Sequence, residues 1–260
     1  DELLTIIPTL KDEAELATWR AQQTPEQYER EFEGSFDAAI AGAYFGREIR
    51  DAERDGRICE VPHDPSVPAY TAWDLGKGVN LAVWVFQVVG AEVHVIDFLE
   101  GEHSEGIPTM LKKIRSLGYP IKNDYVPHDA KATELGSERT RIETLRLHKR
   151  LPILVWDHKI EDGINAARIE FHRFWFDEIR CKSGLEALRQ YCAEFDEQAK
   201  VFKNTPKHDW TSHASDAFRY MCMAWRQMTM PKPKKVEEPL RGPITVDEWL
   251  AYVKPKKMRV

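Results

Sequence analysis

The chain has 260 residues, 42% of them hydrophobic and 31% charged, which suits one medium-sized domain with extensions or two small domains. The formal net charge of −6 argues against a protein that coats nucleic acid, but it allows an enzyme with a local basic groove. No apolar run approaches the roughly 18 residues of a membrane span, and no signal peptide opens the chain. The four cysteines form no C-x-x-C pair and are expected to be reduced thiols in a cytosolic protein.

Residues 1–60 are predicted to be mostly helical. Thr24 followed by Pro25 is a typical helix start, with the threonine as N-cap and the proline at the first helical position. A second short helix is expected at 45–55, followed by a glycine. Nothing in this segment indicates chemistry.

Three antiparallel strands are predicted next, at 69–76, 80–89 and 91–98, because short apolar runs alternate with glycine turns at hairpin spacing. Apolar residues at helical spacing then predict a helix at 107–117. A fourth strand at 123–129 follows this helix. A helix between two strands implies a crossover, so the fourth strand should lie parallel to the first.

The second half of the chain continues the alternation. A fifth strand is expected at 151–155. A hairpin or loop is expected at 200–208, followed by a strong final helix at 211–226 and a tail that begins at 231. Two further helices are expected from apolar residues at helical spacing: Ile164, Ala167, Phe171 and Phe174 for the first, and Leu185, Leu188, Cys192 and Phe195 for the second.

Three aspartates stand out in this pattern. Asp74 lies inside a buried strand, where a carboxylate is costly without a partner. Asp129 ends the strand predicted to be its parallel neighbour, and Asp216 shares a helical face with His213. Carboxylates brought together repel one another, and a divalent cation removes that penalty. Oxygen ligands favour Mg²⁺ or Mn²⁺ over Zn²⁺.

The segments Ala72–Gly76, Val126–Ala130 and His213–Ala217, in this order, resemble the nuclease motifs of viral large terminase subunits, the DNA-packaging motors of tailed bacteriophages. The resemblance runs through roughly residues 30–228. It implies an α/β, ribonuclease-H-like (integrase-like) fold with a mixed five-stranded sheet flanked by helices. By the resemblance, Asp74, Asp129 and Asp216 match the metal-binding carboxylates.

The resemblance also implies a domain organisation. Residues 61–230 would be the nuclease domain, residues 1–60 a helical linker or the trailing edge of an ATPase domain, and residues 231–260 a C-terminal tail. The sequence has no G-x-x-x-x-G-K-[ST] loop, so ATPase activity is not expected in this fragment.

The implied activity is cleavage of concatemeric viral double-stranded DNA during genome packaging, by phosphodiester hydrolysis with two Mg²⁺ or Mn²⁺ ions. Catalytic roles fall to Asp74, Asp129, Asp216 and His213, the last matching a histidine that some members place beside the third carboxylate. The implied partners are DNA, the portal protein of the procapsid, the small terminase subunit and an ATPase domain of the same polypeptide. The resemblance does not imply binding to a membrane. The implied location is the host cell cytoplasm, transiently at the procapsid portal.

Several interpretations stay open at this stage. Lys131, Arg139 and Arg141 follow the second motif and could hold the DNA backbone, although a solvated charged helix explains them nearly as well. Asp97 is a weaker fourth acidic candidate, since an ordinary strand-end carboxylate also explains it. The alternatives for function are another ribonuclease-H-like enzyme, such as a resolvase or transposase core, and a non-catalytic module that docks on the portal.

Overall fold

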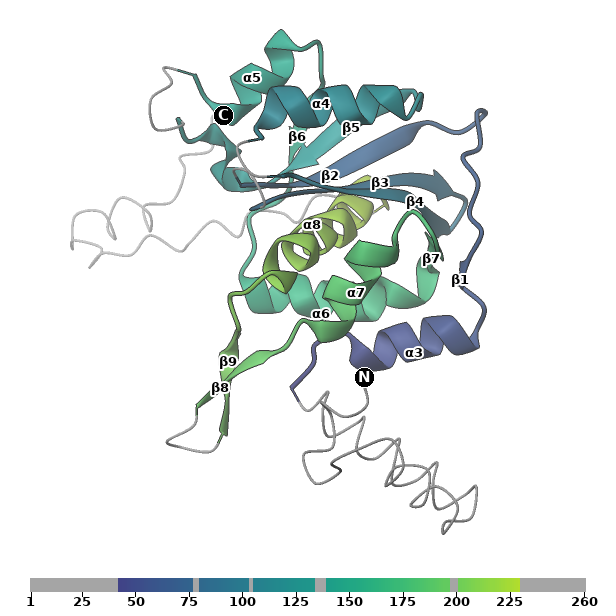
Figure 1. The fold of residues 1–260 in the computed structure, drawn as a ribbon, viewed down its shortest axis with the longest axis vertical. Helices are drawn as coiled ribbons and strands as arrows, with labels where there is room; N and C mark the ends of the chain where they lie inside the picture. The colour runs from purple at the N-terminus through teal and green to yellow at the C-terminus, as the bar shows by residue number, and fades with distance from the viewer. Residues whose placement is uncertain (1–41, 77–79, 103–104, 134–138, 197–200, 230–260) are drawn as a thin grey trace, which may run out of the picture. The chain divides into compact units, whose positions relative to one another are not determined.

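The computed structural model describes residues 42–76, 80–102, 105–133, 139–196 and 201–229 (Figure 1). The predicted helix at Thr24 and the tail at 231–260 lie outside the described residues. No described helix is both long enough and apolar enough to cross a membrane. All four cysteines are free thiols, and Cys181 and Cys222 are buried.

The centre of the fold is a seven-stranded mixed sheet with the order β1-β7-β4-β3-β2-β5-β6. Its strands are β1 (Ile58–Cys59), β2 (Ala69–Leu75), β3 (Leu81–Val89), β4 (Glu92–Glu100), β5 (Ile121–Val126), β6 (Pro152–Leu154) and β7 (Phe174–Asp177). A separate two-stranded hairpin contains β8 (Ala193–Asp196) and β9 (Val201–Pro206).

Helices cover both faces of this sheet (Figure 1). The described α-helices are α3 (Gly46–Arg54), α4 (Ile107–Ser116), α5 (Arg141–Leu147), α6 (Ile160–Glu170), α7 (Lys182–Gln190) and α8 (Thr211–Thr229), with short 3₁₀ turns η3 (His128–Lys131) and η4 (Phe171–Arg173). The helices α4 and α5 lie on one face, and α6, α7 and α8 lie on the other (Figure 1).

The five predicted strands all form, and their pairing is as expected. β2, β3 and β4 are an antiparallel meander, and β5 pairs in parallel with β2 after the crossover helix α4. Because side chains alternate across a sheet, Trp73 enters the core beneath α4, while Ala72 enters the core shared with α8. Asp74 shares the face of Ala72, so it is directed toward the α8 side.

The prediction of a five-stranded sheet was wrong, since the sheet has seven strands. The strand β7 pairs in parallel with both β4 and β1, and it includes Phe174, which was expected to continue a helix. Phe195 likewise lies in β8 and not in the helix α7, which ends at Gln190. A short apolar run can be a strand or a buried helical turn, so periodicity alone does not separate the two.

The helix α3 packs on the same core as the rest of the described fold. Phe45, Ile49 and Ala52 are fully buried, and the Phe45 ring meets Phe218 of α8 edge-on at 5.7 Å between centroids. Residues 46–54 are therefore part of this core. The domain boundary at residue 60 stays a prediction.

Candidate metal and catalytic site

Asp74 lies near the carboxyl end of β2, next to the first turn of α8. Its Oδ2 lies 2.8 Å from Nδ1 of His213, and only about a fifth of each side chain is exposed. Burial raises the pKa of the Asp74 carboxyl, the charge of Asp216 adds to this increase, and His213 and Arg219 oppose it. The partner that a buried strand carboxylate requires is here a histidine of a distant segment.

The start of α8 is fixed by a local cap. Asp209 Oδ1 accepts hydrogen bonds from the backbone N–H of Thr211 at 3.0 Å and from its hydroxyl at 2.6 Å. The Ser212 hydroxyl in turn accepts from the backbone N–H of Asp209 at 3.0 Å. These reciprocal bonds satisfy backbone groups at the helix start. They set the position of His213 in the first turn.

Asp216 lies one turn further along α8 and is paired with Arg219. The Arg219 Nη2 donates to Asp216 Oδ1 at 2.7 Å and its Nε donates to the same oxygen at 3.2 Å. The arginine side chain is only 3% exposed and the aspartate 29%. A buried guanidinium needs such a partner, so this pair holds the Asp216 side chain in place.

Asp129 lies in η3, directly after the carboxyl end of β5. Since β5 is the parallel neighbour of β2, Asp129 and Asp74 lie at the same edge of the sheet. The Asp129 side chain is 59% exposed, and its Oδ2 lies 3.5 Å from Nη1 of Arg141. It is the most open of the three predicted carboxylates.

The structure adds Glu100, a neighbouring carboxylate that the sequence analysis missed. Glu100 pairs with Ala82, and Ala82 pairs with Asp74, so the three residues form one row across β4, β3 and β2. Loss of hydration raises the pKa of Glu100, and the positive charge of His213 opposes this increase. A β-bulge between Val85 and Phe86 shifts the pairing of β3 with β4 by one residue, so the register set by the hairpin turn alone would not have placed Glu100 opposite Ala82. Asp97, the weaker sequence candidate, instead accepts a hydrogen bond from the backbone N–H of Phe98 at 2.9 Å.

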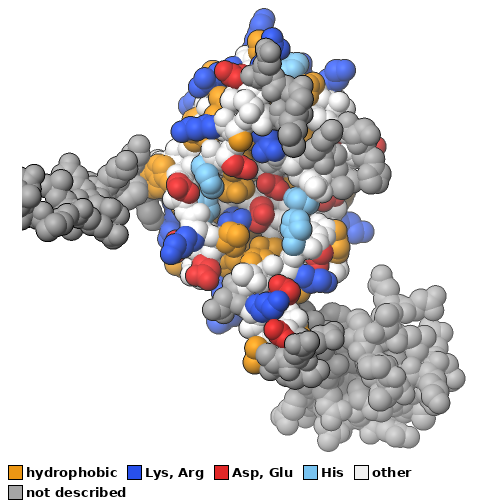
Figure 2. All heavy atoms as spheres, turned by 90° about the vertical axis from the view of Figure 1, so that its left-hand side faces the viewer, with side chains coloured by type: hydrophobic (Ala, Val, Ile, Leu, Met, Phe, Trp, Pro, Cys, Tyr) orange, Lys and Arg blue, Asp and Glu red, His pale blue; other side chains and the backbone are white. Residues whose placement is uncertain are grey.

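The donor atoms at this edge of the sheet suit a hard divalent cation. Asp74, Asp129 and Asp216 offer carboxylate oxygens, the ligands that Mg²⁺ and Mn²⁺ prefer. Within the described part of the chain, however, no group of three or more His, Cys, Asp and Glu side chains is close enough to hold a metal ion. The three carboxylates are therefore of the ligand type that these metals prefer. In the structure, each carboxylate is instead paired with a nitrogen group of His213, Arg141 or Arg219. Figure 2 shows acidic side chains and histidines gathered at the middle of one face.

The predicted DNA-contacting residues lie close to Asp129 in the chain. Lys131 and Arg139 are exposed, and Arg141 begins α5 and faces Asp129. This position is compatible with a basic rim beside the acidic edge. The DNA contacts themselves stay a prediction.

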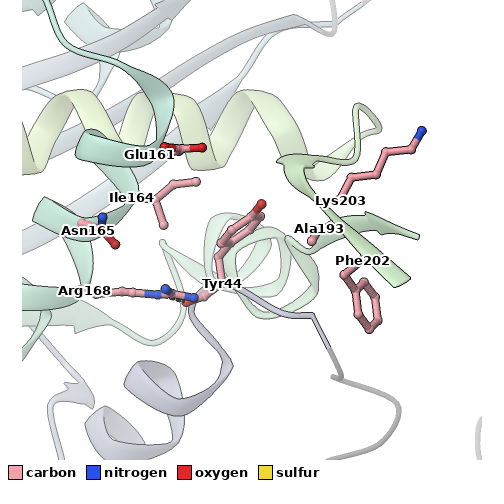
Figure 3. Close-up of a pocket in the computed structure, with 8 residues that line it drawn as sticks. All are labelled: Tyr44, Glu161, Ile164, Asn165, Arg168, Ala193, Phe202 and Lys203. Atoms are coloured by element: carbon pink, nitrogen blue, oxygen red, sulfur yellow. Dashed lines mark hydrogen bonds between the residues drawn. The ribbon is translucent and has the colours of Figure 1, made fainter. Parts of the chain in front are cut away.

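A separate pocket of about 390 Å³ lies between α6, the β8–β9 hairpin and Tyr44 (Figure 3). Arg168 of α6 extends toward Tyr44, where its Nε donates to the backbone carbonyl of Tyr44 at 2.7 Å. Glu161 and Lys203 line the same pocket. None of the predicted site residues lines it, so it is distinct from the acidic edge.

Together, the mixed seven-stranded sheet and the helices on both of its faces define an α/β domain, with an acidic edge beside β2. No protein-family model matches the chain, and no curated protein matches it. Solved structures do match. The large terminase of a thermophilic bacteriophage, in complex with ADP, gives a TM-score of 0.53 at 15% sequence identity, over 68% of this chain and 44% of that chain.

Two nuclease structures match with lower scores. The large terminase nuclease from thermophilic phage G20c with bound magnesium gives a TM-score of 0.48 at 12% identity, over 72% of this chain and 97% of that chain. The g2p large terminase nuclease domain from bacteriophage SPP1 with bound Mn gives 0.46 at 14% identity, over 63% and 87%.

The chain therefore shares its fold with part of the ADP-bound large terminase, and the resemblance stated from the motifs is confirmed at the level of fold. The match spans less than half the length of the ADP-bound large terminase. At 15% sequence identity, this match supports the fold alone. The activity, substrates and partners are proposals.

Proposed function

We propose that the chain is a Mg²⁺- or Mn²⁺-dependent endonuclease that cuts concatemeric viral double-stranded DNA during genome packaging. The observation that carries the proposal is the 2.8 Å contact between Asp74 and His213. It joins the first and third motifs, which are 139 residues apart in the chain, at the carboxyl end of β2. Perturbed carboxylate and histidine groups in contact are typical of functional sites.

In the proposed site, Asp74, Asp129 and Asp216 would hold two divalent ions. These ions would supply Lewis-acid activation of a water molecule and stabilise the charge on the phosphate and the leaving oxygen. Arg219 keeps the Asp216 carboxylate in a fixed orientation, because two of its nitrogen atoms donate to one carboxylate oxygen. Asp129 is open enough to rotate toward the ions.

His213 is proposed as the residue that orients or deprotonates the attacking water. When Asp74 accepts a hydrogen bond from Nδ1–H, the Nε2 atom is left as an acceptor for a proton. Asp74 also raises the pKa of His213, with smaller contributions from Asp216 and Glu100. A more basic imidazole accepts a proton more readily, which suits a general base.

Substrate binding is assigned to the basic residues beside Asp129. Lys131, Arg139 and Arg141 would contact the phosphate backbone of double-stranded DNA. The net charge of −6 predicts weak intrinsic affinity, so partners are proposed to deliver the substrate. We propose the portal protein, the small terminase subunit and an ATPase domain of the same polypeptide as these partners, in the host cytoplasm. No ATPase activity is assigned to the 260 residues.

The proposal is tested by plasmid cleavage in Mg²⁺ or Mn²⁺, with and without EDTA. Asp74→Asn keeps the size of the side chain but removes its charge. It should reduce cleavage by at least about 100-fold, because losing one group that stabilises charge in the transition state raises the barrier by about 2.7 kcal/mol or more. Asp97→Asn is a matched control, since Asp97 is also a buried strand aspartate whose pKa is raised by burial. The control should retain cleavage. Wild-type activity that persists in EDTA, or full activity in Asp74→Asn, would rule the site out.

The two alternative functions predict different results in the same assay. A resolvase-like enzyme would prefer four-way DNA junctions over linear duplex DNA. A non-catalytic docking module would show no metal-dependent cleavage while still folding. The Asp74–His213 pair favours a catalytic domain over the docking module, because a carboxyl and an imidazole that are in contact and both have raised pKa values are typical of functional sites.

A further inference from the structure

The helix α8 presents one narrow face to the acidic edge. Between residues 211 and 225, His213, Asp216 and Tyr220 are only partly buried, whereas the other side chains are buried. Their spacing of three and four residues places the three on one helical face. Two of them already belong to the proposed site, which leaves Tyr220 without an assigned role.

The Tyr220 ring is held by its neighbours. The guanidinium carbon of Arg219 lies 5.4 Å from the centre of the ring, and the His158 ring meets it edge-on with centroids 5.8 Å apart. The ring also packs against the core beneath α8. Arg219 is the residue that pairs with Asp216, so the ring and the carboxylate share one anchor.

The electrostatic surroundings of the phenol point to the same region. Burial and the charges of Asp216, Asp74 and Asp129, partly opposed by Arg219, raise the pKa of Tyr220 to about 12. All three predicted metal carboxylates therefore lie within electrostatic range of this hydroxyl group. A neutral phenol keeps its proton and can donate a hydrogen bond to a carboxylate.

We propose that Tyr220 is a positioning residue of the nuclease site: in the metal-bound chain, its hydroxyl donates a hydrogen bond to one of the carboxylates and fixes that carboxylate for the divalent ion. The inference rests on the proposed function, because it assumes a metal at this edge of the sheet. Groups that orient metal-binding side chains typically change metal affinity or activity by about 10- to 100-fold when they are removed.

The test is the variant Tyr220→Phe, which keeps the ring and its packing and removes only the hydroxyl. Binding of Mn²⁺ to the full 260-residue chain is measured from the electron paramagnetic resonance signal of the free ion, without DNA. The expected result is a Kd for Mn²⁺ about 10-fold weaker than in the wild type. In cleavage assays, kcat should fall while KM for DNA stays unchanged.

Tyr70→Phe is the matched control, because Tyr70 packs against the same core from β2 but precedes Asp74 by four residues. It should bind Mn²⁺ as the wild type does. Equal affinity in Tyr220→Phe and wild type, or equal losses in both variants, would overturn the role of the hydroxyl while leaving the nuclease proposal intact. A wild-type chain that binds no Mn²⁺ would overturn both proposals.

Discussion

The pairing of Asp216 with Arg219 predicts that two mutations of proposed metal carboxylates differ greatly in their effect on stability. Asp216→Ala leaves the guanidinium of Arg219, which is 3% exposed, without its carboxylate partner. Asp129→Ala removes a carboxylate that is 59% exposed and whose contact with Arg141 is long, at 3.5 Å. Both variants should lose cleavage, but only the first should lose substantial stability.

The expected magnitudes follow from burial. Removing one partner of a buried pair costs about 3–5 kcal/mol, and the partial exposure of Asp216 favours the lower end, about 3 kcal/mol. An exposed pair such as Asp129 with Arg141 contributes about 0–1 kcal/mol. For a domain of this size, about 3 kcal/mol corresponds to a fall in Tm of roughly 6–12 °C.

Urea denaturation and thermal melting in EDTA measure the difference. The double variant Asp216→Ala/Arg219→Met should recover most of the lost stability, because it removes the buried charge together with its partner. The reasoning is refuted if Asp216→Ala melts within about 2 °C of the wild type, a shift too small for an uncompensated buried charge. It is also refuted if the double variant is no more stable than the single one.

Three further predictions concern the same fold. The pKa of His213 is raised in the folded protein, so protonated His213 stabilises the fold. In EDTA, this stabilisation should be complete below pH 6.5 and should be lost as the pH rises through the folded-state pKa of His213. Urea denaturation at several pH values should show that His213→Gln removes this part of the pH dependence of the unfolding free energy. Glu100→Gln should lower the pKa of His213 in an NMR titration, because one of its negative neighbours is removed, and an unchanged value would show that the two groups do not interact. Gly184→Ala should lower the unfolding free energy measured in urea by about 1–3 kcal/mol, because the added methyl group would lie 2.3 Å from the Trp84 ring. Gly106→Ala is the control and should be nearly neutral, because its methyl group would lie 3.8 Å from the Pro108 ring.

Much of the fold can be predicted from the sequence because hairpin spacing and helical periodicity are local signals. They yield the meander of β2, β3 and β4 and, with the crossover rule, the parallel pairing of β5 with β2. The strands β1 and β7 have two and four residues, too few to establish a period. They pair with each other, and β7 also pairs with β4, through tertiary contacts that no local pattern records.

Part of the candidate site can likewise be predicted from the sequence, and part cannot. The first and third motifs, which the sequence singles out, meet where His213 contacts Asp74, and strand adjacency places Asp129 at the same edge of the sheet. The pairing of Arg219 with Asp216 depends on which face of α8 is buried, and the row that includes Glu100 depends on strand register. Both are properties of packing, which the spacing of residues in the chain does not contain.

The central claim is that three carboxylates from distant segments hold divalent ions at the carboxyl end of β2. A crystal of the chain grown with Mn²⁺ tests it directly, because the anomalous scattering of manganese locates each ion. We predict anomalous peaks bounded by Asp74, Asp129 and Asp216. Manganese bound only elsewhere, or no peak at this edge at saturating Mn²⁺, would contradict the assignment.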